Sequence, residues 1–166
     1  MLLLDRHGPK EDVWERAEYL CQAESNFVLA PFGAVADSPL VDSDLRLGAL
    51  LETNRAIEDV APFFGRLELI VIHFANATDG RGFVTARRLR WAGYKGTLRA
   101  FGALVADQFP EALASGFDEI EAIGAGARQP VETWMKALDG ISFFQRRDDG
   151  ARAVIADERL AQAVNG

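Results

Sequence analysis

Cysteine and histidine are scarce in this chain. Cys21 is the single cysteine, and His7 and His73 are the only histidines among 166 residues. One cysteine excludes an internal disulfide and any zinc or iron–sulfur centre held by the cysteines of a single chain. Catalysis through a Ser-His-Asp or Cys-His group would have to use one of the two histidines. We therefore expect no metal site.

Basic residues are outnumbered by acidic ones, and long apolar runs are missing. The chain has 18 Lys and Arg against 25 Asp and Glu, which gives a net charge of −7. Long-range attraction to nucleic acid or to an anionic membrane is therefore not expected. No apolar run approaches the ~18 residues that a membrane span requires. Asp5 and Arg6 interrupt the apolar start at once, unlike a signal peptide, so we expect a cytoplasmic protein.

The stretch from 67 to 93 is the most informative part of the sequence. Leu67 to Phe74 is almost continuously apolar, as in a strand buried on both faces of a parallel sheet. Polar and glycine residues then predict a turn, and an apolar stripe at helical spacing predicts a helix that ends near Gly93. Such a unit places the N-terminus of the helix at the carboxyl edge of the sheet, where open α/β sheets bind ligands.

The same patterns predict further elements on both sides of this unit. Before it, we expect a helix over 11–23, strands over 27–32 and 45–51, and a short helix capped by Asn54. Pro31 assigns the first of these strands to an edge or a strand end, because proline cannot donate to a ladder. After the unit, we expect strands over 97–101 and 117–123 and helices over 106–115 and 130–141.

Alternating strands and helices at short spacing predict one α/β domain over residues 1–166, with 1–26 as an N-terminal extension that contains a helix and 146–166 as a C-terminal tail. Our first expectation is a parallel sheet of about four or five strands with helices on both faces. The alternative is half of a (β/α)8-like barrel, because repeating βα units do not say whether the sheet closes.

The turn after the central strand is the candidate anion site. Arg81 can offer a charged fork beside free backbone N–H groups of the helix. In the structural alternative, Asp79 caps the helix, Arg81 pairs with a carboxylate, and no ligand is needed. For Arg99 in the next strand, a structural ion pair with Asp79, Asp107 or Asp118 is the other role. The candidate residues are Thr78, Asp79, Gly80, Arg81, Gly82 and Arg99.

A second group of residues is a candidate pocket lining: His73, Asn76, Gly102, Asp107 and Gln108. His73 would serve as a general base if it met a substrate at the sheet edge, and a hydrogen-bonded core histidine is the structural alternative. The glycines at 124 and 126 form only an incomplete dinucleotide loop. We therefore expect no tightly bound cofactor. Arg87, Arg88 and Arg90 are predicted on the outer side of their helix, as a solvated face or a docking surface for an acidic partner.

Several segments in order resemble one bacterial family of unknown function. They are Thr78-Asp-Gly-Arg-Gly-Phe83, Ala86-Arg-Arg-Leu-Arg90, Gly93-Tyr-Lys-Gly-Thr-Leu-Arg-Ala100, Gly102, Asp107-Gln108, Gly116-Phe-Asp118 and Ala137-Leu-Asp-Gly-Ile-Ser142 with Gln145. Members of this family are encoded beside sulfite reductase and are often labelled probable oxidoreductases involved in sulfite reduction. The chain departs from the family pattern at Ala103, where an acidic residue is usual, and at Ser115, where a cysteine is usual.

The resemblance implies a role in sulfite or sulfate assimilation. One reading is an accessory protein that binds a partner reductase or a small oxyanion; the other is an oxidoreductase with a dissociable cofactor. A reductase subunit with its own sirohaem and cluster would need several cysteine ligands, which this chain lacks. The expected partners are sulfite reductase, another sulfur-assimilation protein, or a second copy in a homodimer through an apolar patch near Trp91 or Phe143 and Phe144.

Overall fold

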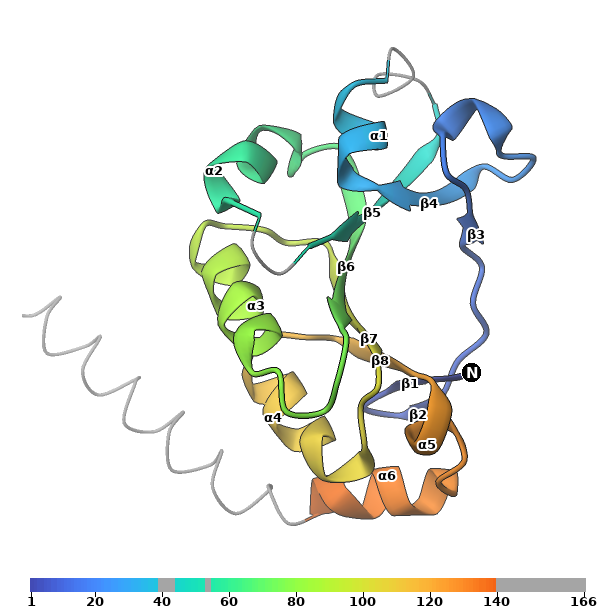
Figure 1. Ribbon diagram of the computed structural model, residues 1–166, viewed down its shortest axis with the longest axis vertical. Helices are drawn as coiled ribbons and strands as arrows, with labels where there is room; N and C mark the ends of the chain where they lie inside the picture. Colours follow the sequence, from blue (N-terminus) through green and yellow to red (C-terminus); the bar gives the residue numbers. More distant parts are fainter. Residues whose placement is uncertain (39–43, 53–54, 140–166) are drawn as a thin grey trace, which may run out of the picture.

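The computed structural model describes residues 1–38, 44–52 and 55–139, which form one mixed sheet with helices packed on it (Figure 1). The strands are β1 (Leu2–Asp5), β2 (Gly8–Pro9), β3 (Glu15–Arg16), β4 (Phe27–Pro31), β5 (Arg46–Leu51), β6 (Leu67–Phe74), β7 (Thr97–Gly102) and β8 (Glu119–Ala122). The longer helices are α3 (Arg81–Trp91) and α6 (Val131–Asp139). The shorter ones are α1 (Phe32–Ala36), α2 (Ile57–Val60), α4 (Phe109–Ala114) and α5 (Gly124–Ala127), with 3-10 turns η1 (Leu20–Gln22), η3 (Ala61–Phe63) and η4 (Ala106–Gln108).

The strands from β3 to β8 lie in the sheet in the order of the sequence and run parallel. The full order is β2-β1-β8-β7-β6-β5-β4-β3, and β1 runs antiparallel to both of its neighbours, β2 and β8. A parallel sheet wound in one direction, with a helical connection after each strand, is the arrangement of a (β/α)8 barrel that has not closed. The half-barrel alternative is therefore confirmed.

The helices cover one face of this sheet, so the expectation of helices on both faces is wrong. The main apolar core joins β-strand side chains to residues of α1, α2, α3, α4 and α6. The smaller cluster on the other face holds Leu29, Leu69 and Val71 with Trp14, Leu50 and Phe101, and no helical residue. The physical reason is the strand order, because right-handed connections that always advance in one direction fall on the same face.

An extended N-terminal segment covers the other face, so the expected helix over 11–23 is also wrong. Residues 10–14 are irregular, β3 pairs in parallel with β4, and only Leu20–Gln22 makes a 3-10 turn. The apolar residues at helical spacing do not share a face: Val13 is 58% exposed, whereas Trp14 packs against the sheet. Long-range pairing with the sheet overrides local helical periodicity here. The first residues of the chain also belong to the sheet, because β1 pairs with β8 and its Leu4 is fully buried.

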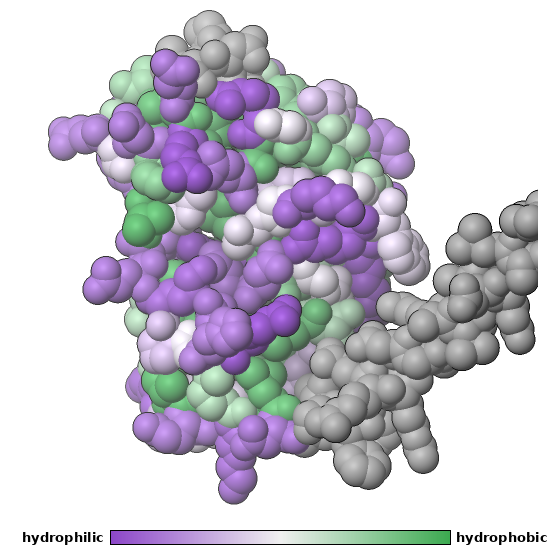
Figure 2. All heavy atoms as spheres, turned by 180° about the vertical axis from the view of Figure 1, so that it is seen from behind, coloured by the Kyte–Doolittle hydropathy of each residue, from purple (hydrophilic) through white to green (hydrophobic). Residues whose placement is uncertain are grey.

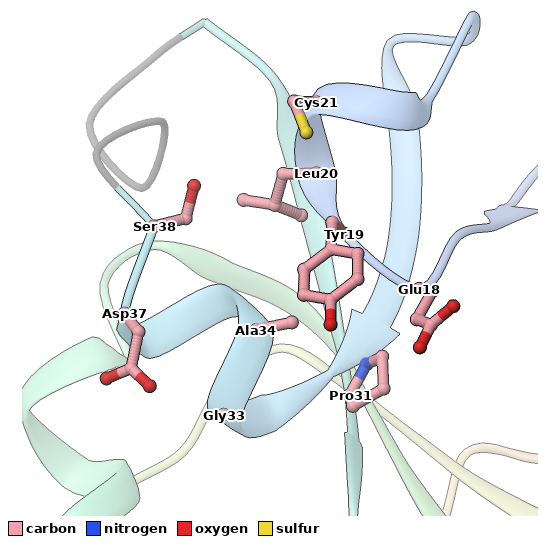
Figure 3. A pocket seen from close by; sticks show the side chains of 9 residues that line it. All are labelled: Glu18, Tyr19, Leu20, Cys21, Pro31, Gly33, Ala34, Asp37 and Ser38. Carbon is pink, nitrogen blue, oxygen red and sulfur yellow. The ribbon is translucent and has the colours of Figure 1, made fainter.

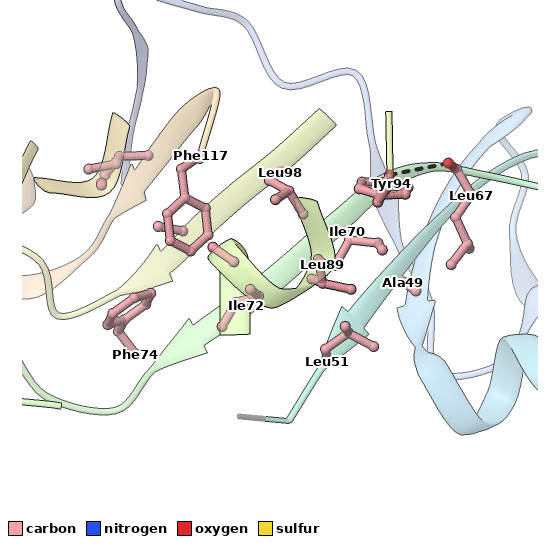
Figure 4. Close-up of a cluster of buried hydrophobic side chains, with 14 of the residues drawn as sticks. Ala49, Leu51, Leu67, Ile70, Ile72, Phe74, Leu89, Tyr94, Leu98 and Phe117 are labelled. Atoms are coloured by element: carbon pink, nitrogen blue, oxygen red, sulfur yellow. Dashed lines mark hydrogen bonds between the residues drawn. The ribbon is translucent and has the colours of Figure 1, made fainter. Parts of the chain in front are cut away.

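The central strand and the helix that follows it form the middle of the core (Figure 4). Leu89 of α3 lies over Ile70 and Ile72 of β6, and all three side chains are fully buried. At one end of this cluster the hydroxyl of Tyr94 donates to the carbonyl of Leu67 at 3.2 Å. Burial raises the pKa of this phenol above its ordinary value, so the hydroxyl stays a donor.

Arg90 ties α3 to the start of β7 and to the loop before β8. Its guanidinium donates to the carbonyls of Gly116, Tyr94 and Gly96 at 2.9, 3.0 and 2.8 Å, and to the carboxylate of Asp118 at 2.6 Å. The prediction that Arg90 lies on the outer side of the helix is therefore wrong. A helix with 3.6 residues per turn directs position 90 toward the same side as Ala86, where the three carbonyls that accept from Arg90 gather.

Most of the remaining predicted elements are confirmed by α3, α4 with η4, α6 and the strands β4 to β8. Pro31 ends β4, as expected of a proline in a strand. Asn54, the tail 146–166 and the Phe143-Phe144 pair lie outside the described residues. Within the described ranges, no helix is long and apolar enough to cross a membrane. Seen from behind, hydrophilic side chains cover much of the surface, with hydrophobic ones between them (Figure 2).

Candidate functional site

A pocket of about 660 Å³ opens at the carboxyl ends of β4, β5 and β6. Its walls come from the end of β4 and the start of α1, from the end of β5 and the residues after it, and from the turn between β6 and α3. The lining residues are Pro31, Phe32, Gly33, Leu50, Leu51, Glu52, Arg55, His73, Ala75, Asp79 and Arg81. This is the edge at which parallel α/β sheets bind ligands, and the volume is that of a small-molecule site.

Arg55 is one of the two cations that line this pocket. Among the described residues, it has no carboxylate partner. Its guanidinium lies over the ring of Phe32, 5.5 Å from the ring centre. Its backbone N–H donates to the carbonyl of Glu52 at 3.1 Å, but the side chain of the exposed Glu52 does not pair with it. A half-buried guanidinium with free donors is suited to binding an oxyanion.

Arg81 and Asp79 form a closed pair in the turn before α3. The carboxylate of Asp79 accepts two hydrogen bonds from the guanidinium of Arg81, each at 2.8 Å, and one from the backbone N–H of Arg81 at 3.2 Å. The hydrogen bond from the guanidinium lowers the pKa of Asp79 to about 2. Asp79 therefore points back to the helix, as in the structural alternative. The side chain of Arg81 nevertheless remains 71% exposed.

His73 reaches the pocket from the end of β6. Its side chain is exposed and its ring lies 5.4 Å from the ring of Phe101 on the next strand. The alternative of a buried core histidine is therefore wrong. Strand alternation is the cause, since Ile72 and Phe74 point to the helical layer and His73 points to the opposite face. His73, Asp79 and Arg81 are the predicted site residues that the structure brings together in this pocket.

Four other predicted residues do not line the pocket, and three of them, Asn76, Thr78 and Gln108, make hydrogen bonds that hold the turn. The side-chain oxygen of Asn76 accepts from the backbone N–H and hydroxyl of Thr78 at 3.1 and 2.8 Å. Gln108 donates from its amide to the carbonyl of Ala77 at 2.7 Å and accepts from the backbone N–H of Val105 at 3.1 Å. Asp107 is exposed beside it. These contacts fix the turn to η4 and hold the position of Asp79.

The predicted glycines serve packing within the protein. A Cβ on Gly82 would lie 2.2 Å from the ring of Phe74, and one on Gly102 would lie 2.0 Å from the carbonyl oxygen of Phe74. Gly102 also has a φ of +138°, which side chains rarely allow. Both glycines therefore let Phe74 sit under the turn. Gly80 has open space around it, because a Cβ at this position would meet no atom within 4 Å.

Arg99 lies on the face opposite the helices, in a buried ionic cluster, and not in the pocket. It donates to Glu119 at 2.7 Å, to Glu121 at 3.0 Å and to both oxygens of Asp12 at 2.8 and 3.0 Å. Its expected partners Asp79, Asp107 and Asp118 are therefore wrong, although the ion pair itself is confirmed. The reason is the register of β7 and β8, which places Arg99 directly opposite Glu119.

Two further cations complete the ionic cluster around Arg99. Lys10 pairs with Glu119 at 2.6 Å and lies 4.0 Å from Asp5, and Arg16 pairs with Glu121, so every carboxylate of the cluster has a cationic partner. Burial opposes the charge of Arg99, but the hydrogen bonds that it donates to Asp12 and the charge of Glu119 outweigh burial and raise the pKa of Arg99. For Asp12, burial favours the neutral acid, and the contacts with Arg99 overcome it and lower the pKa. The cluster is therefore fully paired and holds the N-terminal segment on the sheet.

A second cleft of about 610 Å³ lies on the other side of α1 (Figure 3). Tyr19, Leu20 and Cys21 form one wall, and Gly33 and Ala34 of α1 form the facing one. Its charged lining residues are Glu18 and Asp37, both acidic. This cleft is therefore unsuited to an anion. No group of three or more metal-ligating side chains occurs within the ranges that the structure describes.

Sequence reasoning misses the contribution of β4 and β5 to the pocket, because it does not identify Arg55, Phe32 or Glu52. A signal for them exists, since the rule that ligands bind at the carboxyl ends of parallel strands applies equally to the residues that follow 31 and 51. Which of the strand ends gather around one pocket depends on the strand order, which the sequence pattern does not give.

The model of one protein family matches most of the chain. The match, to "Bacterial protein of unknown function (DUF934)", covers residues 48–155. It includes Arg55, His73 and Arg81, but not the pocket wall from β4 and α1 or the N-terminal members of the ionic cluster. No curated protein matches the sequence.

Proposed function

Because the chain belongs to this bacterial family of unknown function (DUF934), we propose the role that the family resemblance implies, an accessory protein of sulfite or sulfate assimilation that binds a small oxyanion and a partner reductase. The observation that carries the oxyanion part is the pocket at the carboxyl ends of β4, β5 and β6, with Arg55 inside it and Arg81 at its rim.

The chemistry of the lining supports an anion over a cation or an apolar ligand. Arg55 offers a guanidinium without a carboxylate partner among the described residues, and Arg81 lines the same pocket with a side chain that is 71% exposed. Arginine forks match the planar spacing of oxyanion oxygens and remain charged at every physiological pH. Glu52 opposes an anion, and because it is exposed it can turn away into water.

Calorimetric titration of the purified protein with sulfite and with sulfate, in a phosphate-free buffer, tests the oxyanion part. We expect saturable binding that weakens in Arg55→Ala and Arg81→Ala by about 1.5–3 kcal/mol each, the usual scale of a charged hydrogen bond. Glu52→Gln should strengthen binding because it removes a repelling charge. Arg88→Ala, on the exposed part of the same helix as Arg81, is the matched control and should leave the affinity unchanged.

Two results would contradict the oxyanion proposal. The first is the absence of any affinity for either anion in the native protein. The second is an affinity that Arg55→Ala and Arg81→Ala leave intact, since that would assign the anion to another part of the surface.

The alternative function is an oxidoreductase of sulfite reduction with a dissociable cofactor. The volume of about 660 Å³ favours it, because sulfite alone would fill a small part of such a pocket. Phe32, Leu50 and Leu51 supply an apolar wall for a ring, and Arg55 and Arg81 supply cations for phosphate groups. Titration with NADPH and with flavin mononucleotide, followed by fluorescence, separates the two functions. Micromolar nucleotide binding that Arg55→Ala abolishes would favour the enzyme.

A further inference from the structure

The outer surface of α3 carries an unusual combination of side chains. Val84, Arg87, Arg88 and Trp91 are spaced by three, four and seven residues, which places them on one stripe of the helix. We call this stripe the α3 outer face. The opposite side of the helix, with Phe83, Ala86 and Leu89, is buried in the core. In Figure 1, α3 lies between α2 and α4 in the helical layer, so its outer face is turned away from the sheet.

Trp91 is largely exposed, although it is one of the largest apolar side chains in the described ranges. Its side chain is 82% exposed, and Val84, two turns earlier on the same stripe, is 52% exposed. The indole makes no ring contact with any other described aromatic residue. Tryptophan and arginine are the residue types most enriched among the side chains that dominate protein–protein binding energy.

The charge of the α3 outer face is opposite to that of the protein. The helix has four arginines and no acidic residue, in a chain whose net charge is −7. Arg90 is engaged within the fold, whereas Arg88 has no ion pair among the described residues, and Arg87 has only a 3.8 Å contact with exposed Glu111. Complementary charge across an interface directs partner choice and speeds association.

We propose that the α3 outer face docks an acidic protein surface that holds an apolar pocket for Trp91. The proposal takes the identity of that protein, a reductase, from the proposed function and therefore rests on it. A second copy of this chain is a poor occupant, because a two-fold interface would place Arg87 and Arg88 of one copy against the same residues of the other. Like charges that face one another across an interface disfavour it.

The α3 outer face also lies close to the pocket, at the first residue of the helix. Arg81, the first residue of α3, lines the pocket and has a side chain that is 71% exposed. A protein docked along α3 would therefore lie beside the mouth of the pocket. This relation joins the two halves of the proposed function, since an oxyanion held near Arg55 would be released next to the reductase.

The test measures binding of the full chain to purified sulfite reductase from the same organism, by biolayer interferometry at low and at physiological salt. Trp91→Ala should weaken the complex at least tenfold, and Arg88→Glu should weaken it by a similar factor and reduce its salt dependence. Val13→Ala, another exposed apolar side chain, and Arg128→Glu, another arginine outside α3, are the matched controls and should change the Kd less than twofold. Circular dichroism checks that each variant is folded.

The outcomes separate the two proposals. Wild-type binding that neither Trp91→Ala nor Arg88→Glu weakens would overturn the docking surface and leave the proposed function standing. No binding to the reductase would overturn the docking surface and the partner part of the proposed function, while the calorimetric test of the oxyanion pocket would stay valid. Sedimentation that shows a homodimer lost in Trp91→Ala would assign the face to self-association and overturn the acidic partner.

Discussion

Arg99 and Asp12 are 87 residues apart in the sequence and form a two-pronged ion pair, with both carboxylate oxygens within 3.0 Å of the guanidinium. Arg99 is only 2% exposed and Asp12 is 12% exposed. The pair joins the extended N-terminal segment to the middle of the sheet, on the face that has no helix. An ionic cluster therefore occupies the place that a second helical layer takes in a three-layer α/β fold.

Asp12→Ala should destabilise the protein by about 2–3 kcal/mol, toward the low end for breaking a buried ion pair because Glu119 and Glu121 still neutralise Arg99. Urea unfolding followed by circular dichroism measures this loss as a lower midpoint. Glu11→Gln, at the exposed neighbouring position, should change the free energy of unfolding by less than about 0.5 kcal/mol. Equal stability of both variants would mean that the ion pair between Asp12 and Arg99 contributes nothing to the stability of the fold.

The stability of the protein should fall in acid through Asp79. Its folded pKa of about 2 lies below the ordinary value of 3.8, so its contribution is complete above pH 3.8 and is lost as the pH falls toward 2. The difference in unfolding free energy between the wild type and Asp79→Asn should therefore shrink as the pH falls from 3.8 to about 2. Asp107→Asn, at an exposed position without an ion pair among the described residues, is the control. A difference that is constant with pH would show that Asp79 and Arg81 do not pair in solution.

Arg90→Ala should destabilise the protein by about 2–3 kcal/mol, because three backbone carbonyls lose this donor and the carboxylate of Asp118 keeps only the backbone N–H of Leu98. Arg90→Lys should recover little of this loss, since an ammonium group cannot reach all four acceptors in the fixed geometry of a guanidinium. Thermal unfolding compares both with Arg88→Ala, which removes an exposed arginine of the same helix. If Arg90→Lys were as stable as the wild type, the geometry of the guanidinium would contribute nothing to the stability of the protein.

Gly102→Ala should prevent stable folding or reduce the melting temperature by more than about 10 °C. Its φ of +138° is unfavourable for alanine, and the new Cβ would lie 2.0 Å from the carbonyl oxygen of Phe74. Gly65→Ala meets no atom within 4 Å and should be close to neutral. The yield of folded protein and its melting temperature by scanning calorimetry distinguish the two. A stable Gly102→Ala protein would require β6 and β7 to separate at their carboxyl ends.

The local pattern of the sequence determined the elements that are regular and buried. The apolar run of β6, the stripe of α3 and the proline that ends β4 each act through contacts within a few residues, so their interpretation needed no knowledge of the fold. The turn from Asn76 to Arg81 was located for the same reason. In one of the two alternatives, local chemistry also predicted that Asp79 turns back toward the helix and that Arg81 pairs with a carboxylate. In the structure the carboxylate of Asp79 accepts from the backbone N–H and the guanidinium of Arg81, but the N-cap position itself is Gly80.

The tertiary structure decided what depends on strand order and register. The predicted helix over 11–23 is instead an extended segment, because Asp12 pairs with Arg99 and β3 pairs with the edge of β4. The tertiary structure also moved Arg99 away from the candidate anion site and brought Arg55 and the end of β4 to it. Hydrophobic periodicity shows which side of an element is buried, but not which element covers it. The partners of Arg99 and the wall of the pocket therefore followed only from the order in which parallel strands lie side by side.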